Sequence, residues 1–247
     1  MDLTILFPVL NEHLRLESGI DRCVKYVREN VNIPCKMVII DNGSDDDTPE
    51  IGKALAEKYE YVTYLRIEER GVGIAFKTGV EKADTDIVGY MDIDLSTDLK
   101  YLSRMIDLFE DRPTLSYVNG TRFSRTSDTR GRKWYRKVTS AGLVFILKHY
   151  LKMKATDALC GFTFLRTPVA KKLVKECSDD KGWFYTVEML LRAERAGLEI
   201  EDMPVEWIED YNTTVNVGRT IKNYLKRIRM LKRRFRAEDS AKTTDEE

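Results

Sequence analysis

Asp86-Ile-Val-Gly-Tyr-Met-Asp-Ile-Asp-Leu-Ser96 is an apolar run that ends in two carboxylates. Residues 87–91 favour a buried strand, whereas Asp92 and Asp94 would be costly to bury unless a cation or hydrogen bonds compensated their charge. Residues i and i+2 of a strand point to the same side, so both carboxylates can approach one ion. Carboxylate and phosphate oxygens are ligands that Mg²⁺ and Mn²⁺ prefer. The pair therefore predicts metal and diphosphate binding, with ordinary turn or capping acids as the alternative.

Strands and helices alternate along the N-terminal part of the chain. Continuous apolar runs predict strands at residues 3–9, 37–40, 61–67 and 86–91. Three helices are predicted between these strands. The first ends near residue 30, the second begins at Thr48 and has Pro49 at its first helical position, and the third spans 74–82. This order predicts an α/β fold with a mostly parallel sheet flanked by helices.

Unusual side chains follow these predicted strands directly. They are Glu12, Asp41, Arg70, Gly71, Asp92 and Asp94. Ligands of parallel sheets bind beyond the carboxyl ends of the strands, so the six residues predict one binding site. Gly71 and Gly73 allow close backbone approach or a positive φ, and Arg70 could meet a phosphate or a base, with a plain turn as the alternative.

Composition limits the class of protein. A chain of 247 residues with 43% hydrophobic residues can bury a core of its own. Four cysteines without Cys-x-x-Cys spacing and two histidines indicate neither a zinc site nor a disulfide scaffold. No signal peptide opens the sequence and no apolar run approaches the ~18 residues of a membrane span, so we expect a cytoplasmic protein.

Four motifs of the N-terminal half resemble those of the family 2 inverting glycosyltransferases with the GT-A (Rossmann-like) fold. In order they are Pro8-Val-Leu-Asn-Glu12, Asp41-Asn-Gly-Ser-Asp-Asp-Asp-Thr48, Gly71-Val-Gly-Ile-Ala75 with Gly79, and Met91-Asp-Ile-Asp-Leu95. Four motifs in order are far more specific than any one of them. The resemblance implies a single GT-A catalytic domain over residues 1–215. Its first half, 1–120, would bind a nucleotide sugar, and its second half, 121–215, would bind the acceptor.

The resemblance also implies roles for individual residues. Those implied to bind the nucleotide sugar are Pro8, Glu12, Asp41, Arg70, Gly71 and Asp92. Asp41 would lie near the base. Asp92 and Asp94 would hold Mg²⁺ or Mn²⁺ on the diphosphate, and Asp94 is also implied to be catalytic. Asn42 stands where the family often has a second acid, which weakens a role for position 42 but leaves Asp41 untouched.

The second half of the chain resembles the polyprenyl-phosphate sugar transferases, which are the dolichyl-phosphate mannose and glucose synthases and their bacterial relatives. The matching segments are Arg122, Arg136-Lys-Val-Thr-Ser140 and Asp157-Ala-Leu-Cys-Gly-Phe162. Two arginines of those relatives are linked to the lipid phosphate. The resemblance implies this role for Arg122 and Arg136, with Arg132 as the competitor for the second position.

A basic and apolar stretch without acids runs from Thr129 to Thr156. Its apolar part, Val138 to Leu147, is too short to cross a bilayer. It could lie at a membrane interface or bind an anionic lipid head. A helix packed on the sheet, with a solvated basic face, is the alternative, and the sequence leaves both open.

Glu188 is the candidate acid of the C-terminal part. The elements predicted around it are helices at 98–110, from Thr167 and at 184–196, and strands at 116–120 and 199–207. Glu188 is the acid of a Phe-x-x-x-Glu-x-Leu pattern, Phe184 to Leu190. Members of the family usually carry an acid at this position of the pattern, near the sugar or acceptor, so the resemblance implies a catalytic role for Glu188. A surface glutamate paired with Arg192 at i+4 is the alternative. Residues 211–217 resemble a polar segment that often closes over the nucleotide.

A basic amphipathic helix is predicted over residues 216–237, because apolar residues form one stripe and Lys and Arg cover the rest. Cations near an anionic leaflet contribute ~1 kcal/mol each at best, so several together could hold the protein on a membrane surface. Recruitment by a membrane-bound partner protein is an alternative. No nucleic-acid-binding motif accompanies the helix. Residues 238–247 are rich in acids and are predicted to form a disordered tail.

Three functions are consistent with these residues. The first is metal-dependent, inverting transfer of glucose or mannose from a UDP- or GDP-sugar to a polyprenyl or dolichyl phosphate at the cytoplasmic face of a membrane. The second is transfer to a sugar hydroxyl of a cell-surface polysaccharide or glycolipid, which would need Glu188 or Asp157 as a general base. The third is an inactive scaffold that binds sugar nucleotides, against which the intact Asp92 and Asp94 argue.

Overall fold

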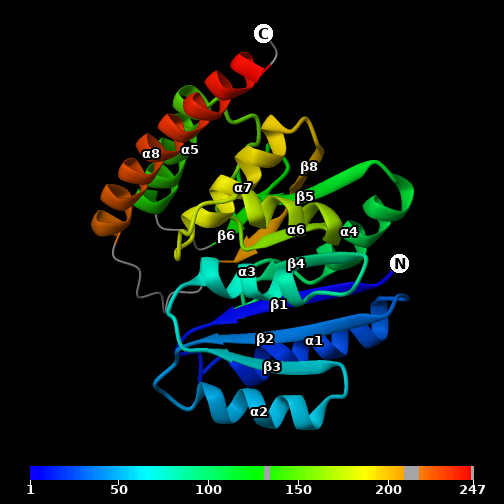
Figure 1. Cartoon of the computed structure of the whole chain (residues 1–247). Coiled ribbons are helices and arrows are strands. Elements are labelled where there is room, and N and C mark those ends of the chain that lie inside the picture. The colour runs from blue at the N-terminus through cyan, green and yellow to red at the C-terminus, as the bar shows by residue number, and fades with distance from the viewer. Residues whose placement is uncertain (131–133, 209–216, 246–247) are drawn as a thin grey trace. The chain divides into compact units, whose positions relative to one another are not determined.

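The computed structural model describes residues 1–130, 134–208 and 217–245, without the side chains of 130, 134–137, 217–221 and 242–245. The chain forms two compact units (Figure 1). The first consists of Met1–Arg132 and Ala155–Glu209, and the second of Lys133–Lys154 and Asp210–Glu247. The sequence placed residues 133–154 in the acceptor half of one domain. In the structure they group with the C-terminal segment, and the assignment of an acceptor-binding half stays a prediction.

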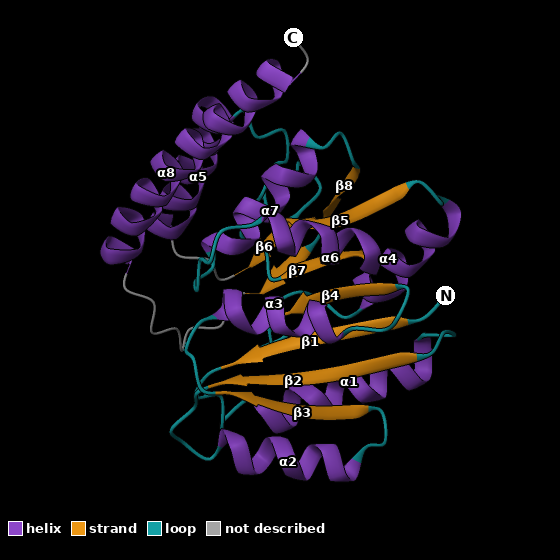
Figure 2. Ribbon diagram, in the orientation of Figure 1, coloured by secondary structure: helices purple, strands orange, loops and turns teal. Residues whose placement is uncertain are grey.

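The first unit is built on a seven-stranded sheet in the order β3-β2-β1-β4-β7-β5-β8 (Figure 2). Its strands are β1 (Leu3–Val9), β2 (Cys35–Asn42), β3 (Val62–Ile67), β4 (Ile87–Met91), β5 (Leu115–Thr121), β7 (Phe162–Arg166) and β8 (Glu199–Pro204). Neighbouring strands are parallel except at β7, which is antiparallel to both β4 and β5. The predicted mostly parallel sheet flanked by helices is therefore confirmed.

Within the part of the chain that the structure describes, six helices cover the sheet. They are α1 (Leu16–Asn30), α2 (Thr48–Lys58), α3 (Val72–Lys82), α4 (Lys100–Asp111), α6 (Thr167–Glu176) and α7 (Phe184–Arg195). The apolar stripes of α1 and α4 join one core cluster with β1, β2 and β4, as the predicted core packing of the 98–110 helix requires. Helices α3, α6 and α7 contact one another on the sheet (Figure 2).

Strand β7 is an element that the sequence did not predict. Residues 162–166 lie in a stretch whose chemistry was interpreted through its motif, and an antiparallel strand of five residues carries little periodicity of its own. The predicted strand at 199–207 is divided into β8 and β9 (Glu206–Ile208), and β9 pairs with β6 (Asp128–Arg130). Insertion of β7 between β4 and β5 brings the 157–161 segment beside the acidic end of β4.

The second unit contains two helices that contact each other, α5 (Trp134–Leu151) and α8 (Val217–Asp245) (Figure 1). The helix continues to Asp245, through residues 238–245 of the segment for which the sequence predicts a disordered tail. A physical reason is the i,i+4 ion pair between Arg234 and Glu238, at 3.3 Å, which joins an acid of the tail to a base one turn earlier. Residues 211–216 of the predicted polar segment lie outside the described residues.

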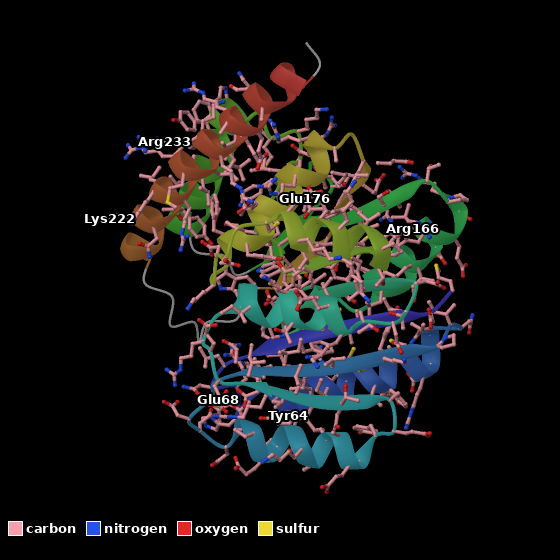
Figure 3. All side chains as sticks on the ribbon, in the orientation of Figure 1. Tyr64, Glu68, Arg166, Glu176, Lys222 and Arg233 are labelled. Atoms are coloured by element: carbon pink, nitrogen blue, oxygen red, sulfur yellow. The ribbon has the colours of Figure 1, made fainter. Side chains whose placement is uncertain are left out.

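The two helices of this unit carry both buried and exposed side chains. On α8, Ile228, Leu231 and Phe235 are buried, whereas Lys222 and Arg233 (Figure 3) are exposed. Large apolar side chains are exposed as well, namely Val138, Phe145, Tyr150 and Met230. No helix in the described part of the chain is both long and apolar enough to span a membrane.

Candidate active site

Asp41 stands at the carboxyl end of β2 with its side chain fully buried. Its Oδ2 accepts hydrogen bonds from the Tyr64 hydroxyl at 2.6 Å and from Nη1 of Arg66 at 3.0 Å, and its Oδ1 accepts one from the backbone N–H of Ser44 at 2.8 Å. Tyr64 lies on β3 (Figure 3). Burial and the bond to Asp41 raise the pKa of Tyr64 to about 12. The carboxylate is thus held rigidly at the edge where the loops of β1, β2 and β3 meet.

Asn42 ties together the loops that follow three different elements. Its Nδ2 donates to the carbonyl of Val9 at 2.6 Å, and its Oδ1 accepts the backbone N–H of Gly71 at 2.9 Å. An aspartate has no donor for the Val9 carbonyl. The amide at a position where the family often has an acid is therefore explained by its role in joining the loops.

Replacement of this amide by a carboxylate should be costly. We expect Asn42→Asp to lower the free energy of unfolding by about 1–3 kcal/mol, because it places a carboxylate oxygen against the buried Val9 carbonyl. Urea denaturation of the two proteins at pH 7 measures the loss. Asn30→Asp, at the exposed end of α1, serves as the control. Equal loss of stability in both variants would contradict the role given to Asn42.

Gly71 and Gly73 receive the backbone of another loop. A Cβ on Gly71, which has a φ of +149°, would lie 2.2 Å from the carbonyl oxygen of Lys181. The backbone N–H of Gly73 donates to the same oxygen at 3.0 Å. Arg70 donates to the Gly43 carbonyl at 3.1 Å and to Asp45 at 2.9 Å. The close approach that the sequence predicted is present, but the chain itself supplies the partner.

The two carboxylates of the DxD motif follow β4, and both are partly exposed. Oδ1 of Asp94 accepts the backbone N–H of Ser96 at 2.9 Å. Burial and the neighbouring Asp94 raise the pKa of Asp92 to about 7, with Glu12 adding to the rise and Arg122 and Arg15 opposing it. Two carboxylates that repel each other favour a proton or a cation between them. Asp92 and Asp94 therefore fit a divalent cation by their donor atoms and by their electrostatics.

Other metal-ligating side chains do not gather elsewhere in the described ranges. No three His, Cys, Asp or Glu residues there are arranged to hold a metal ion. Mg²⁺ is usually bound through one or two carboxylates together with substrate phosphates and water. The DxD pair matches this pattern.

Arg122 pairs inside the protein with Asp157. Its Nε and Nη2 donate to the two carboxylate oxygens at 2.7 and 3.1 Å, and its guanidinium lies 4.9 Å from the ring centre of Trp207. The side chains of Arg122 and Asp157 are only 8% and 1% exposed. Burial alone would raise the pKa of Asp157, but the charge and hydrogen bonds of Arg122 hold this pKa below its usual value. An arginine predicted to bind a lipid phosphate thus has a carboxylate partner of its own.

Glu188 is buried on α7 and carries several hydrogen bonds. Its Oε1 accepts Nε of Arg192 and the backbone N–H of Ser178, at 3.0 and 3.1 Å, and its Oε2 accepts the Ser178 hydroxyl. The i,i+4 pair with Arg192 is confirmed, but the expected surface position is wrong, because the Glu188 side chain is 1% exposed. Glu188 thereby anchors the 178–182 loop that packs on Gly71 and Gly73.

Comparison with known proteins places this geometry in a family. Residues 4–174 match the Glycosyl transferase family 2. The chain belongs to this family. The resemblance found in the sequence is thereby confirmed.

This family 2 member is similar in sequence to several glycosyltransferases. The chain is 28% identical over 226 residues to Glycosyltransferase AglD of Haloferax volcanii, covering 90% of this chain and 35% of that protein. It is 25% identical to the dolichyl-phosphate beta-glucosyltransferases of Dictyostelium discoideum and Drosophila melanogaster, covering 84% and 85% of this chain and 66% and 68% of those proteins. The chain therefore spans between about a third and two thirds of the length of these relatives.

Solved structures show the same fold. Glucosyl-3-phosphoglycerate synthase from Mycobacterium tuberculosis with bound UDP superposes with a TM-score of 0.67 at 18% identity, covering 92% of this chain and 80% of that one. This likeness concerns the fold alone, and it confirms the predicted GT-A architecture.

The remaining predicted residues of this family 2 chain fall in different places. Pro8 lies within β1, and the backbone N–H of Glu12 donates to the hydroxyl of Thr48 at 2.8 Å. Arg136 lies on α5, in the second unit, and its side chain is not among those described. Arg132 lies outside the described residues. The nucleotide, acceptor and catalytic roles of the predicted site residues remain predictions.

Sequence reasoning missed three contributors to the site. Arg15 forms an ion pair with Glu12 at 2.7 Å, and its place at i+3 from a site acid was the available signal. Arg66 pairs with Asp41, and a base near the end of a strand beside an acidic strand end would have suggested it. Gly161 was quoted only as part of the 157–162 motif, and its place next to Asp92 follows from the pairing of β7 with β4.

Proposed function

We propose that this family 2 member transfers a hexose, with inversion, from a UDP- or GDP-sugar to a polyprenyl phosphate. The observation that carries the proposal is the pair of carboxylates after β4, where burial and mutual repulsion raise the pKa of Asp92. Two relatives are named dolichyl-phosphate beta-glucosyltransferases, which are enzymes with an acceptor of this class. Glucose and mannose are the candidate sugars.

The residues divide the work between donor and acceptor. Asp92 and Asp94 would hold Mg²⁺ or Mn²⁺, and the bound cation would stabilise the charge of the departing diphosphate. Asp41, pinned by Tyr64 and Arg66, would orient the nucleotide base near the ends of β2 and β3. Structures of the synthase with this fold hold UDP together with Mn²⁺ or Mg²⁺, and those ligands are features of that protein.

A phosphate acceptor suits the acids of this site. The second pKa of a phosphate monoester is about 6, so its oxygen is ionised near pH 7 and needs no strong general base. Glu188 and Asp157, the bases that a hydroxyl acceptor would require, are both buried in ion pairs with arginines. The lowered pKa of Asp157 makes it a weak proton acceptor, and both carboxylate oxygens of Glu188 already accept hydrogen bonds from Arg192 and Ser178. The hydroxyl acceptor is therefore the less favoured alternative.

The second unit supplies the surface for a membrane-embedded acceptor. Helix α8 exposes Lys222, Lys226, Arg229 and Arg233, and exposed Phe145 and Tyr150 lie on α5. Basic residues with interleaved apolar side chains favour binding to anionic bilayer surfaces. We propose peripheral attachment at the cytoplasmic face, with recruitment by a membrane-bound partner protein as the alternative.

Transfer of radiolabelled hexose tests the function. A panel of UDP- and GDP-sugars, with Mg²⁺ or Mn²⁺, is offered to the wild type together with a short polyprenyl phosphate. We expect label in the lipid fraction from one donor. Nucleotide binding without transfer to this acceptor would favour the hydroxyl acceptor or, if no acceptor is glycosylated, an inactive scaffold. Arg136→Ala, compared with Lys148→Ala on the same helix, tests the predicted phosphate contact.

Cation binding should depend on pH through Asp92. Its pKa is raised to about 7, so a proton must leave before the cation binds at lower pH. We expect the affinity for Mn²⁺ in the presence of UDP to rise about fivefold from pH 6 to pH 7 and about twofold more by pH 8, where it levels off. Electron paramagnetic resonance of free Mn²⁺ measures the affinity. In Asp92→Asn the residual affinity should lose this pH dependence, and an unchanged profile would assign the proton to another group.

A further inference from the structure

Gly161 lies directly opposite Asp92. It precedes β7, whose first residue, Phe162, pairs with Met91 of β4 in an antiparallel register. The backbone N–H of Asp92 donates to the carbonyl of Gly161 at 3.3 Å. The backbones of the two residues are therefore held together by the ends of two paired strands.

The carboxylate of Asp92 occupies the space that a side chain at position 161 would need. A Cβ on Gly161 would lie 1.8 Å from Oδ2, 2.2 Å from Cγ and 2.7 Å from Oδ1 of Asp92. Rotation of the carboxylate about χ2 moves the oxygens but leaves Cγ in place. Relief therefore requires a change of χ1, which would carry the whole carboxylate to another position, or a separation of the paired strands.

We propose that Gly161 is a positioning residue for the cation site. Its missing side chain leaves the room in which Asp92 can stand with its carboxylate beside Asp94. The inference rests on the proposed function in one respect, since it assumes that Asp92 and Asp94 bind the cation. The steric relation between Gly161 and Asp92 holds independently of that assumption.

Gly161→Ala tests the proposal through two measurements. The first is Mn²⁺ affinity in the presence of UDP, followed by electron paramagnetic resonance, which we expect to fall at least tenfold. The second is thermal unfolding of Gly161→Ala, Asp92→Ala and the double variant without metal. Since all three atoms nearest to the added Cβ belong to the Asp92 carboxylate, the alanine at 161 should lower Tm in the wild-type background and have little effect in the Asp92→Ala background.

Gly120→Ala is the matched control. Its added Cβ would crowd the same segment from β5, with Cys160 Sγ and the Phe162 carbonyl oxygen both at 3.0 Å, and no atom of Asp92 is among its three nearest neighbours. We expect some loss of Tm in this variant without the loss of Mn²⁺ affinity.

The outcomes distinguish the positioning role of Gly161 from the cation-binding role of Asp92 and Asp94. Wild-type Mn²⁺ affinity in Gly161→Ala, or an equal loss of Tm in both backgrounds, would overturn the proposal. If Gly161→Ala fails to fold, a folded double variant supports it and an unfolded one refutes it. If the wild type binds no Mn²⁺ with UDP, the cation role in the proposed function falls, and the coupling of Tm values alone decides whether Gly161 positions Asp92.

Discussion

Asp94→Asn should lower kcat/KM for hexose transfer by about a thousandfold, since a metal ion contributes several kcal/mol to the stabilisation of transition-state charge. The amide keeps an oxygen that can accept the backbone N–H of Ser96, now at 2.9 Å from Asp94 Oδ1. The substitution thus removes a charge from the cation site with little change in shape. The same radiolabel assay, at saturating polyprenyl phosphate, measures the loss.

Asp86→Asn is the matched control for this experiment. Asp86 precedes the opposite end of β4, and its side chain is 60% exposed. Asp86→Asn removes one carboxylate from the same segment of chain, and the rate of transfer should stay close to that of the wild type. Activity retained in Asp94→Asn, with Mn²⁺ still required, would show that another group holds the cation.

Arg122→Ala should lower the free energy of unfolding by about 3–5 kcal/mol, because it leaves the carboxylate of Asp157 buried without its counter-charge. The two side chains are almost fully buried and share two hydrogen bonds. Urea denaturation at pH 7 measures the difference. Arg112→Ala, which breaks half-buried pairs with Glu199 and Glu201 at the surface, should cost a small fraction of this.

The pH dependence of this difference identifies the pair. Asp157 has a pKa below its usual value in the folded protein, so the pair stabilises the fold above pH 4 and loses this contribution as the pH falls through the folded pKa. The gap in stability between wild type and Arg122→Ala should therefore narrow in acid. Unchanged stability at pH 7, together with a raised KM for polyprenyl phosphate, would instead restore the phosphate contact predicted for Arg122.

This result matters for any test of the acceptor. Loss of transfer in Arg122→Ala would follow from unfolding as well as from a missing phosphate contact, so that variant cannot distinguish a lipid phosphate from a hydroxyl. Arg136 is the better probe. It lies on α5, among the basic residues of the second unit.

The order of elements and the edge of the sheet that carries the site could be predicted because they depend on local patterns. Apolar runs marked β1 to β4, and chain direction placed Asp41, Asp92 and Asp94 at their carboxyl ends. The buried stripe of α4 was equally plain. Strand β7 escaped prediction because it pairs antiparallel with strands that are remote in sequence, and its own five residues carry too little pattern to announce it.

The sequence by itself determined that this chain is an α/β protein of family 2 with a DxD pair after its fourth strand, since periodicity, turn residues and motif order are written locally. Only the tertiary structure decided the partners of the charged residues. Arg122 and Asp157 are separated by 35 positions, and they meet because β7 enters the sheet between β4 and β5. The same insertion places Gly161 against Asp92. Such contacts depend on which strands become neighbours, and that is settled by the packing of the whole sheet.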